Sequence, residues 1–266
     1  MPLSSIDRRK LTANLVPVMR EAGAKIMDIY ASDFSVTEKA DKSPVTQADA
    51  CAEAIILGQL SVLAPGIPVI AEEAHAAGKR VQPGHTFFLV DPLDGTREFI
   101  NRRDEFTVNI GLIENGLPTM GLIFAPALGR LFCASGVGEA VEISANDVAS
   151  PISVRQTPQD GRIAVVSRSH RDPATEAYLA KQGITEFISA GSSLKFCLLA
   201  AGEADIYPRT GPTCEWDICA GHAILLAARG GLSRLDGQPF VYGKAEENFL
   251  NPGFLAWGGG EPAPPV

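Results

Sequence analysis

Residues 86–100 read TFFLVDPLDGTREFI, and this stretch decides the fold expected for the chain. An apolar run typical of a β-strand ends directly at Asp91, and Asp94 follows after one proline and one leucine. Asp-Gly favours a tight turn, so the two carboxylates are expected at the rigid end of one buried strand. Because Asp-Pro-x-Asp-Gly is a good turn sequence in its own right, a purely structural role for this segment alone stays open.

Two other segments place acidic residues at the ends of apolar elements. Glu72 and Glu73 follow a strand expected at 68–71, and Asp217 lies in the first turn of a helix expected from about 214 to 229. A solvated loop would explain the glutamates, and complementation of the helix dipole would explain the aspartate. Convergence of all these segments would instead gather carboxylates that repel one another unless cations are bound. The carboxylates concerned are those of Glu72, Asp91, Asp94 and Asp217.

An all-oxygen donor set is typical of Mg2+ sites and a poor match for zinc. Bound Mg2+ lowers the pKa of a water, polarises a phosphoryl group and stabilises the departing oxygen, which is the chemistry of phosphate ester hydrolysis. The backbone N–H groups of Gly95 and Thr96 enter a short helix expected at 96–100, where they could hold a phosphate. The Thr96 hydroxyl is a candidate for orienting the attacking water.

The remaining pattern predicts helices packed on an antiparallel sheet in residues 1–155. In residues 156–266 it predicts alternating strands and helices around a sheet that is at least partly parallel. Asn115-Gly116 between two apolar runs predicts a β-hairpin, because both residues accept positive φ. The boundary between the two lobes is placed in the polar segment 146–161. The other expected elements are helices at 6–31, 51–63, 172–182 and 192–201 and strands at 34–38, 162–167, 186–189 and 205–207. Thr46, with Asp49 three residues later, predicts the N-terminal cap of the helix at 51–63.

The composition is that of an ordinary globular protein, with 266 residues of which 45% are hydrophobic and 20% charged. The formal net charge of −8 gives no positive field for a nucleic-acid polymer, so such a partner is not expected. Five scattered cysteines without a CxxC pair indicate reduced thiols, and no apolar run reaches the roughly 20 residues of a membrane span. We therefore expect a cytoplasmic protein. A peripheral membrane association and the choice between monomer and homodimer are left open.

AEE at 71–73, DPLDGTREF at 91–99 and EWDICAG at 215–221 together resemble the inositol monophosphatase-like superfamily. Its members are Mg2+-dependent, lithium-sensitive phosphomonoesterases, and the resemblance covers nearly the whole chain. It implies a layered α/β fold, the αβαβα sandwich of the sugar phosphatases. It also implies two to three Mg2+ ions, the first on Glu72, Asp91 and the Leu93 carbonyl, the second on Asp91, Asp94 and Asp217, and a weaker third by Glu72.

Further segments are similar to the 3′(2′),5′-bisphosphate nucleotidase branch of this superfamily, most closely to the bacterial enzyme of sulfate assimilation. They are KADKSPVTQAD at 39–49, SRSH at 167–170, GSSLKF at 191–196 and ADIYPR at 204–209. The branch implies that Asp41 and Thr96 activate the attacking water. It also implies a nucleotide site lined by His170, Ser192, Lys195 and Arg209, next to Glu72, Leu93, Asp94, Gly95, Thr96 and Asp217.

The charges of Lys195 and Arg209 favour a substrate with two phosphates. In inositol monophosphatases a neutral asparagine stands at the place of Lys195 and a glutamate at the place of Arg209. The ammonium of Lys195 and the guanidinium of Arg209 can instead bind a second phosphate. The alternative is that both cations are surface ion-pair partners of Glu203, Asp205 or Glu215.

The sequence therefore predicts a Mg2+-dependent phosphatase that hydrolyses 3′-phosphoadenosine 5′-phosphate, a small anionic nucleotide, to AMP and phosphate. An inositol 1-phosphatase or another sugar phosphatase with the same metal site is the first alternative. A noncatalytic sensor of nucleotide or metal is the second, and the intact set of predicted site residues argues against it.

Overall fold

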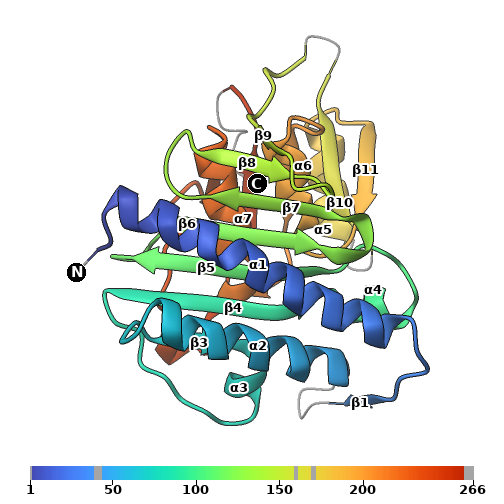
Figure 1. Cartoon of the computed structure of the whole chain (residues 1–266). Coiled ribbons are helices and arrows are strands. Elements are labelled where there is room, and N and C mark those ends of the chain that lie inside the picture. The colour runs from blue at the N-terminus through green and yellow to red at the C-terminus, as the bar shows by residue number, and fades with distance from the viewer. Residues whose placement is uncertain (1, 39–43, 159–160, 169–171, 261–266) are drawn as a thin grey trace.

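The computed structural model describes residues 2–38, 44–158, 161–168 and 172–260. Within these ranges the chain folds into alternating layers of helix and sheet (Figure 1). Asp41 and His170, two of the predicted site residues, lie outside the described residues.

The outer layer contains α1 (Ser5–Tyr30), β1 (Val36–Glu38), β2 (Pro44–Thr46) and α2 (Gln47–Leu63). The side chain of Ser4 caps α1 by accepting a hydrogen bond from the backbone N–H of Asp7. α2 begins with a capping box between Thr46 and Asp49, which the sequence predicts. Both helices lie across one face of a sheet (Figure 1) and bury their apolar sides against it.

The first sheet contains seven strands in chain order: β3 (Val69–Ala71), β4 (Thr86–Asp94), β5 (Thr107–Glu114), β6 (Leu117–Ala125), β7 (Arg130–Ala134), β8 (Ala140–Ile143) and β9 (Ala149–Pro151). β3 and β4 pair in parallel, and every other neighbouring pair is antiparallel. The turn from β5 to β6 is the predicted hairpin, in which Asn115 and Gly116 both have positive φ. A short 3-10 helix (Pro126–Leu128) joins β6 to β7.

Two helices, α6 (Leu194–Ala200) and α7 (Glu215–Ala227), form the layer on the other face of this sheet. α7 comes close to β5 and β6 at Gly111 and Gly121. A Cβ atom on Gly121 would lie 2.3 Å from the carbonyl oxygen of Ala220, so this close approach depends on glycine. The contact fixes the position of α7 relative to the sheet.

The second sheet contains, in spatial order, β11 (Glu186–Ala190), β10 (Ile163–Ser167), β12 (Ile206–Arg209), β16 (Phe254–Trp257) and β14 (Gly231–Arg234). β10 pairs in parallel with β11 and β12, as the alternating pattern of the sequence predicts. Helix α5 packs on the outer face of this sheet, and three apolar clusters fill the spaces between the layers. The remaining elements are α3 (Glu72–Ala76), α4 (Thr96–Ile100), α5 (Pro173–Lys181), β13 (Thr213–Cys214), β15 (Leu250–Asn251) and a 3-10 helix (Ala245–Glu247).

This layered α/β architecture confirms the expected fold class. The sequence patterns missed β7, β8 and β9, which have only five, four and three residues, and the short strands β14 and β16 near the C-terminus. The division of the chain at residues 155 and 156 stays a prediction. None of the helices in the described ranges has the length and hydropathy needed to cross a membrane.

Candidate active site

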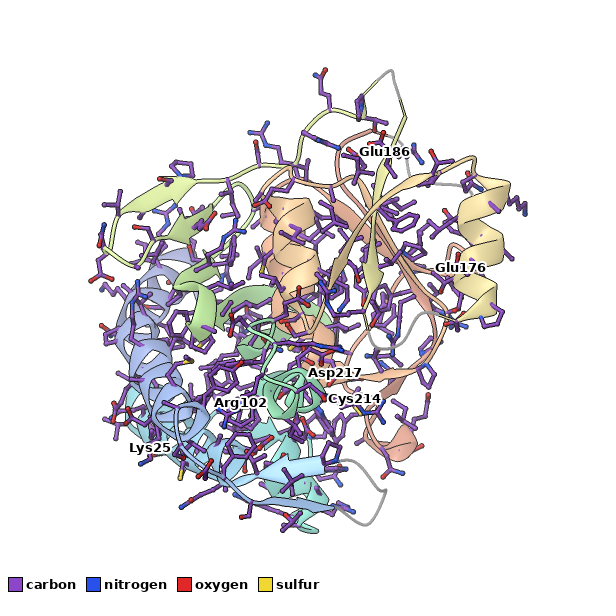
Figure 2. The ribbon with its side chains drawn as sticks, turned by 90° about the vertical axis from the view of Figure 1, so that its right-hand side faces the viewer. Lys25, Arg102, Glu176, Glu186, Cys214 and Asp217 are labelled. Carbon is purple, nitrogen blue, oxygen red and sulfur yellow. The ribbon has the colours of Figure 1, made fainter. Side chains whose placement is uncertain are left out.

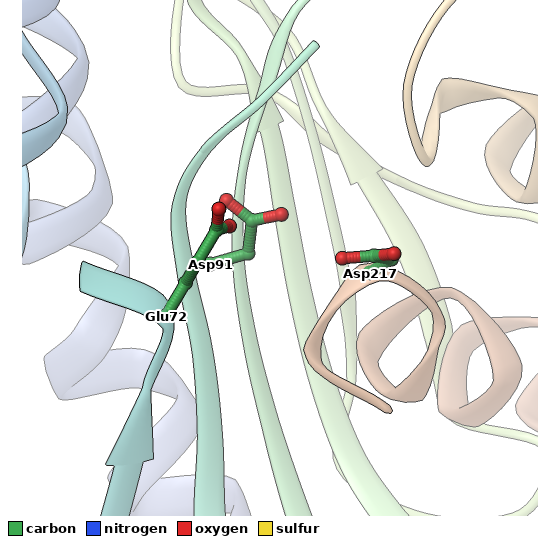
Figure 3. Close-up of side chains that lie close together, drawn as sticks. All are labelled: Glu72, Asp91 and Asp217. Carbon is green, nitrogen blue, oxygen red and sulfur yellow. The ribbon is translucent and has the colours of Figure 1, made fainter. Parts of the chain in front are cut away.

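Three carboxylates from different layers meet beside the first sheet. Glu72 begins α3, Asp91 lies near the end of β4, and Asp217 lies in the first turn of α7. One oxygen of each lies within 4.8 Å of the others, and Figure 3 shows the three side chains turned toward a common space. Figure 2 places Asp217 beside Cys214, between the N-terminal helices and the second sheet. The structure thus brings together three of the four carboxylates predicted to converge.

Asp94, the fourth predicted carboxylate, lies next to this triad but is not a member of it. The pairing of β4 with β5 is irregular between Asp91 and Asp94, where the backbone N–H of Leu93 turns back to bond Asp91 Oδ1 at 3.0 Å. Asp94 Oδ2 accepts hydrogen bonds from the backbone N–H of Ser193 at 2.5 Å and from Asn109 Nδ2 at 3.5 Å. The bulge therefore points Asp94 at α6.

Burial and mutual repulsion shape the acidity of this cluster. Burial, together with the nearby carboxylates, holds the pKa of Asp91 and of Asp217 well above the usual range. Burial also raises the pKa of Asp94, to about 6, although Lys195 and the Ser193 N–H act in the opposite direction. Buried oxygen ligands that repel one another fit a hard divalent cation such as Mg2+, whose charge would offset the repulsion.

A cavity of about 280 Å³ opens over these carboxylates. Eight of the residues predicted for substrate or metal line it: Glu72, Asp94, Gly95, Thr96, Ser192, Lys195, Arg209 and Asp217. Asp91 and Leu93 do not line it and have 2% of their surface exposed, but a carboxylate oxygen of Asp91 lies within 4.8 Å of those of Glu72 and Asp217. The structure therefore gathers around one cavity eight of the ten predicted site residues that it describes.

Two cations face this cavity. Lys195 is only 4% exposed, and its Nζ donates to the carbonyl oxygens of Ser192 at 2.5 Å and Ala190 at 3.4 Å. Burial lowers the pKa of Lys195 to about 8. Arg209 Nη2 donates to the Pro212 carbonyl at 3.4 Å, and its buried Nε has no partner among the residues described. A buried donor without an acceptor needs a partner such as water or an anion.

The alternative interpretation of these cations as surface ion-pair partners is wrong. Each of the three acids considered for it binds another cation: Glu203 pairs with Arg130, Asp205 with Arg155 and Glu215 with Lys244. The charges of Lys195 and Arg209 therefore remain directed to the cavity.

Sequence reasoning missed Asp49 as a site residue and assigned it only to the cap of α2. Its Oδ2 accepts the cap hydrogen bonds from the backbone N–H and the hydroxyl of Thr46, both at 2.8 Å. Its Oδ1 accepts a hydrogen bond from the Thr96 hydroxyl at 3.3 Å, and the Leu93 carbonyl lies 3.2 Å from the same hydroxyl. The sequence signal that could have revealed this role is the cap itself, because capping α2 uses one carboxylate oxygen of Asp49 and leaves the other for a second donor.

Asn109 was missed as well. It is fully buried in β5 and donates to Asp94. The sequence signal was a lone amide inside the otherwise apolar stretch TVNIGLI, because a buried amide needs a polar partner.

The comparisons with known proteins identify the family. The family model described as "Inositol monophosphatase family" matches residues 7–253. The chain belongs to the inositol monophosphatase family. The 3′(2′),5′-bisphosphate nucleotidase CysQ of Salmonella typhimurium is 45% identical over 237 residues, which cover 88% of this chain and 94% of that protein. The corresponding protein of Buchnera aphidicola is 39% identical over 251 residues, covering 93% and 94%.

Solved structures of the inositol monophosphatase family have the same fold. CysQ from Bacteroides thetaiotaomicron superposes with a TM-score of 0.79 at 37% identity, over 94% of this chain and 97% of that one. An inositol monophosphatase from Anabaena gives a TM-score of 0.74 at 26% identity, over 94% and 91%. The family is metal-dependent and generally uses Mg2+, which agrees with the donor set of the carboxylate triad.

Proposed function

We propose that this protein is a 3′(2′),5′-bisphosphate nucleotidase that removes the 3′-phosphate of 3′-phosphoadenosine 5′-phosphate to give AMP and phosphate. The observation that carries the proposal is the position of Lys195 and Arg209 on the cavity above the carboxylates. An inositol phosphate with a single phosphate gains little from two extra cations, whereas a bisphosphate has a second anion for them to bind. The bacterial relatives named 3′(2′),5′-bisphosphate nucleotidase CysQ support the same substrate class. A role in sulfur metabolism stays a prediction from the family resemblance.

The metal would be Mg2+, in two to three ions. Glu72, Asp91 and Asp217 supply oxygens close enough to share a cation. Asp94 lines the same cavity, and the Leu93 carbonyl lies 3.2 Å from the hydroxyl of the lining residue Thr96. When bound, Mg2+ would lower the pKa of the attacking water and offset the charge of the transferring phosphoryl group and the departing ribose oxygen.

Thr96 and Asp49 are placed to direct a water. The Asp49 carboxylate and the Leu93 carbonyl, 3.3 and 3.2 Å from the Thr96 hydroxyl, only accept hydrogen bonds. The hydroxyl is therefore a donor to one of them, and its oxygen would accept a proton donated by water. A water held this way points its own oxygen at the phosphorus, and proton transfer toward Thr96 and Asp49 accompanies its attack. The corresponding role of Asp41 stays a prediction from the family resemblance.

The rest of the cavity would hold the substrate. The phosphate to be removed would lie by Gly95 and Thr96, and the second phosphate by Ser192, Lys195 and Arg209. Arg209, which lines the cavity, would supply guanidinium donors to this second phosphate. The nucleotide contact of His170 stays a prediction, as do lithium inhibition, the cytoplasmic location and the choice between monomer and homodimer.

The test compares three substrates on purified protein with Mg2+: the adenosine bisphosphate, inositol 1-phosphate and a nucleoside 3′-monophosphate. Arg209→Glu should lower kcat/KM for the bisphosphate by about 10- to 100-fold, because it removes charge-assisted hydrogen bonds worth about 1.5–3 kcal/mol, and should change the monophosphates much less. Arg234→Glu, at an exposed arginine of β14, is the matched control. Equal losses for all substrates would remove Arg209 from the second-phosphate site, a preference for inositol 1-phosphate would favour the sugar phosphatase, and turnover of none would favour the sensor.

A further inference from the structure

A chain of fully buried polar side chains lies behind Asp94. Thr107 and Asn109 have no exposed surface, and Ser193 has 2%. In the pairing of β4 with β5, Thr107 stands opposite Asp94 and Asn109 stands opposite Asp91, on the two sides of the bulge. Ser193 comes from the start of α6. These side chains therefore connect the sheet to α6 underneath the carboxylates.

The hydrogen bonds of this chain have one consistent direction. An ionised Asp94 only accepts, so the amide nitrogen of Asn109 must face it and the amide oxygen must face Ser193. The Ser193 hydroxyl donates to that oxygen at 2.7 Å, and the Thr107 hydroxyl, 2.8 Å away, is then the donor to Ser193. Reversing any one of these bonds would leave a buried polar atom unsatisfied, which is costly.

This arrangement divides the two oxygens of Asp94 between two tasks. Both hydrogen bonds found for Asp94 in the described part of the chain go to Oδ2. The side chain lines the cavity, so Oδ1 is the oxygen left for a ligand there. The orientation of Asp94 is consequently set by groups on β5 and α6, and not by the cavity itself.

We propose that Asn109 and Ser193 are positioning residues that hold Asp94 so that it presents one oxygen to the divalent cation. The inference rests on the proposed Mg2+ site and adds residues that never touch the metal. Groups that hold a metal ligand in place typically change metal affinity by about 10- to 100-fold when they are removed. A change of that size is therefore expected for each of the two side chains.

The same contact links the metal site to the substrate site. Ser193 lies between Ser192, whose φ is 48°, and Lys195, whose ammonium donates to the Ser192 carbonyl. A positive φ at a serine needs support from its surroundings. The bond from the Ser193 N–H to Asp94 supplies part of that support, so a displaced Asp94 would also displace the cavity-lining end of α6.

The experiment measures metal binding without turnover. The dissociation constant of Mn2+, used as a paramagnetic substitute for Mg2+, is obtained from the electron paramagnetic resonance signal of free Mn2+ in the presence of the intact protein and no substrate. Asn109→Ala and Ser193→Ala should each raise this constant by about 10-fold or more. Ser193→Thr keeps the hydroxyl and should return the constant to within about threefold of the parent value, which a merely space-filling role of Ser193 would not predict.

Thr12→Val is the matched control. Thr12 is 8% exposed in α1, and its hydroxyl donates to the Arg8 carbonyl at 2.8 Å, so this variant loses a buried hydroxyl bond away from the cavity. It should leave the Mn2+ constant unchanged. Equal constants for the parent, Asn109→Ala and Ser193→Ala would refute the positioning role while leaving the proposed function intact.

If Asn109→Ala does not fold, Ser193→Ala and Ser193→Thr decide the question by themselves, because both keep the backbone N–H that bonds Asp94. An increase in the constant for Thr12→Val as large as that for Ser193→Ala would also refute the proposal, since the effect would then be general destabilisation. A parent protein that binds no Mn2+ would overturn the metal site, and with it both the proposed function and this inference.

Discussion

Removal of the divalent cation with EDTA is expected to make the stability of the protein fall as the pH rises, through the titration of Asp94. Burial raises the pKa of this carboxyl from 3.8 to about 6 in the folded state. Between these two pKa values the folded protein binds more protons than the unfolded chain. The contribution of Asp94 to the free energy of unfolding is therefore complete below pH 3.8 and is lost as the pH rises through about 6. This direction is the reverse of the usual one for an ion-paired carboxylate.

The magnitude follows from the size of the shift. The difference between 3.8 and about 6 corresponds to about 3 kcal/mol of the free energy of unfolding, at about 1.36 kcal/mol per pKa unit. Asp91 and Asp217 act in the same direction, because burial raises the pKa of both. His222 changes the stability in the opposite direction, because burial lowers its pKa to about 3. Its contribution to the free energy of unfolding therefore grows as the pH rises from 3 to 6.5.

The difference between the parent and Asp94→Asn reports the Asp94 carboxylate together with its repulsion of Asp91 and Asp217, since His222 is common to both proteins. Urea unfolding followed by circular dichroism, at pH steps from 4 to 8 in EDTA, should show that the parent loses about 2.5 kcal/mol relative to the variant, because the rest of the change falls below pH 4. Saturating Mg2+ should remove this relative loss. Parallel curves for the two proteins in EDTA would refute the argument, because Asp94 would then have the same pKa in the folded and unfolded states.

Further expected outcomes concern catalysis, packing and inhibition. Asp49→Asn should lower kcat by about 100-fold or more with little change in Mn2+ affinity. Measuring Asp41→Asn beside it shows which of the two aspartates acts with Thr96. An unchanged kcat for Asp49→Asn would exclude Asp49 from this role. Gly121→Ala should lower the free energy of unfolding in urea by about 1–3 kcal/mol or more, because the added methyl group meets the Ala220 carbonyl. Li+ should inhibit hydrolysis in competition with Mg2+, and inhibition that excess Mg2+ does not relieve would contradict the family resemblance on this point.

Features that depend on neighbouring residues in the chain could be predicted from the sequence. The capping box of Thr46 and Asp49 and the hairpin at Asn115-Gly116 are both present, because each is stabilised within four residues. The carboxylates were predictable for a similar reason. Each stands at the end of an apolar element, where a charged side chain is conspicuous.

Such local sequence patterns could not predict contacts between segments that are distant in the chain. Asp49 and Thr96 are 47 residues apart, and Ser193 and Asp94 are 99 apart. A local pattern explains Asp49 fully as a cap, so nothing in its own segment signals the second bond. The acids considered as partners of Lys195 and Arg209 were near in sequence, but Arg130, Arg155 and Lys244 reach them in space. Tertiary packing, and not local propensity, decides which charges meet.

The net charge of −8 says little about the ligand, because the local balance of charge at the cavity differs from it. The cavity's carboxylates outnumber Lys195 and Arg209, and the remaining charges of its lining, Arg97 and Glu98, are opposite in sign. A phosphate about 4 Å from a carboxylate is repelled by about 4 kcal/mol at an effective dielectric constant of about 20. Two Mg2+ ions would add four positive charges and so match Glu72, Asp91, Asp94 and Asp217, leaving the charges of Lys195 and Arg209 for the second phosphate. Where these carboxylates are ionised, the cavity without the cation repels an anionic nucleotide, so we expect the cation to bind before, or together with, the nucleotide.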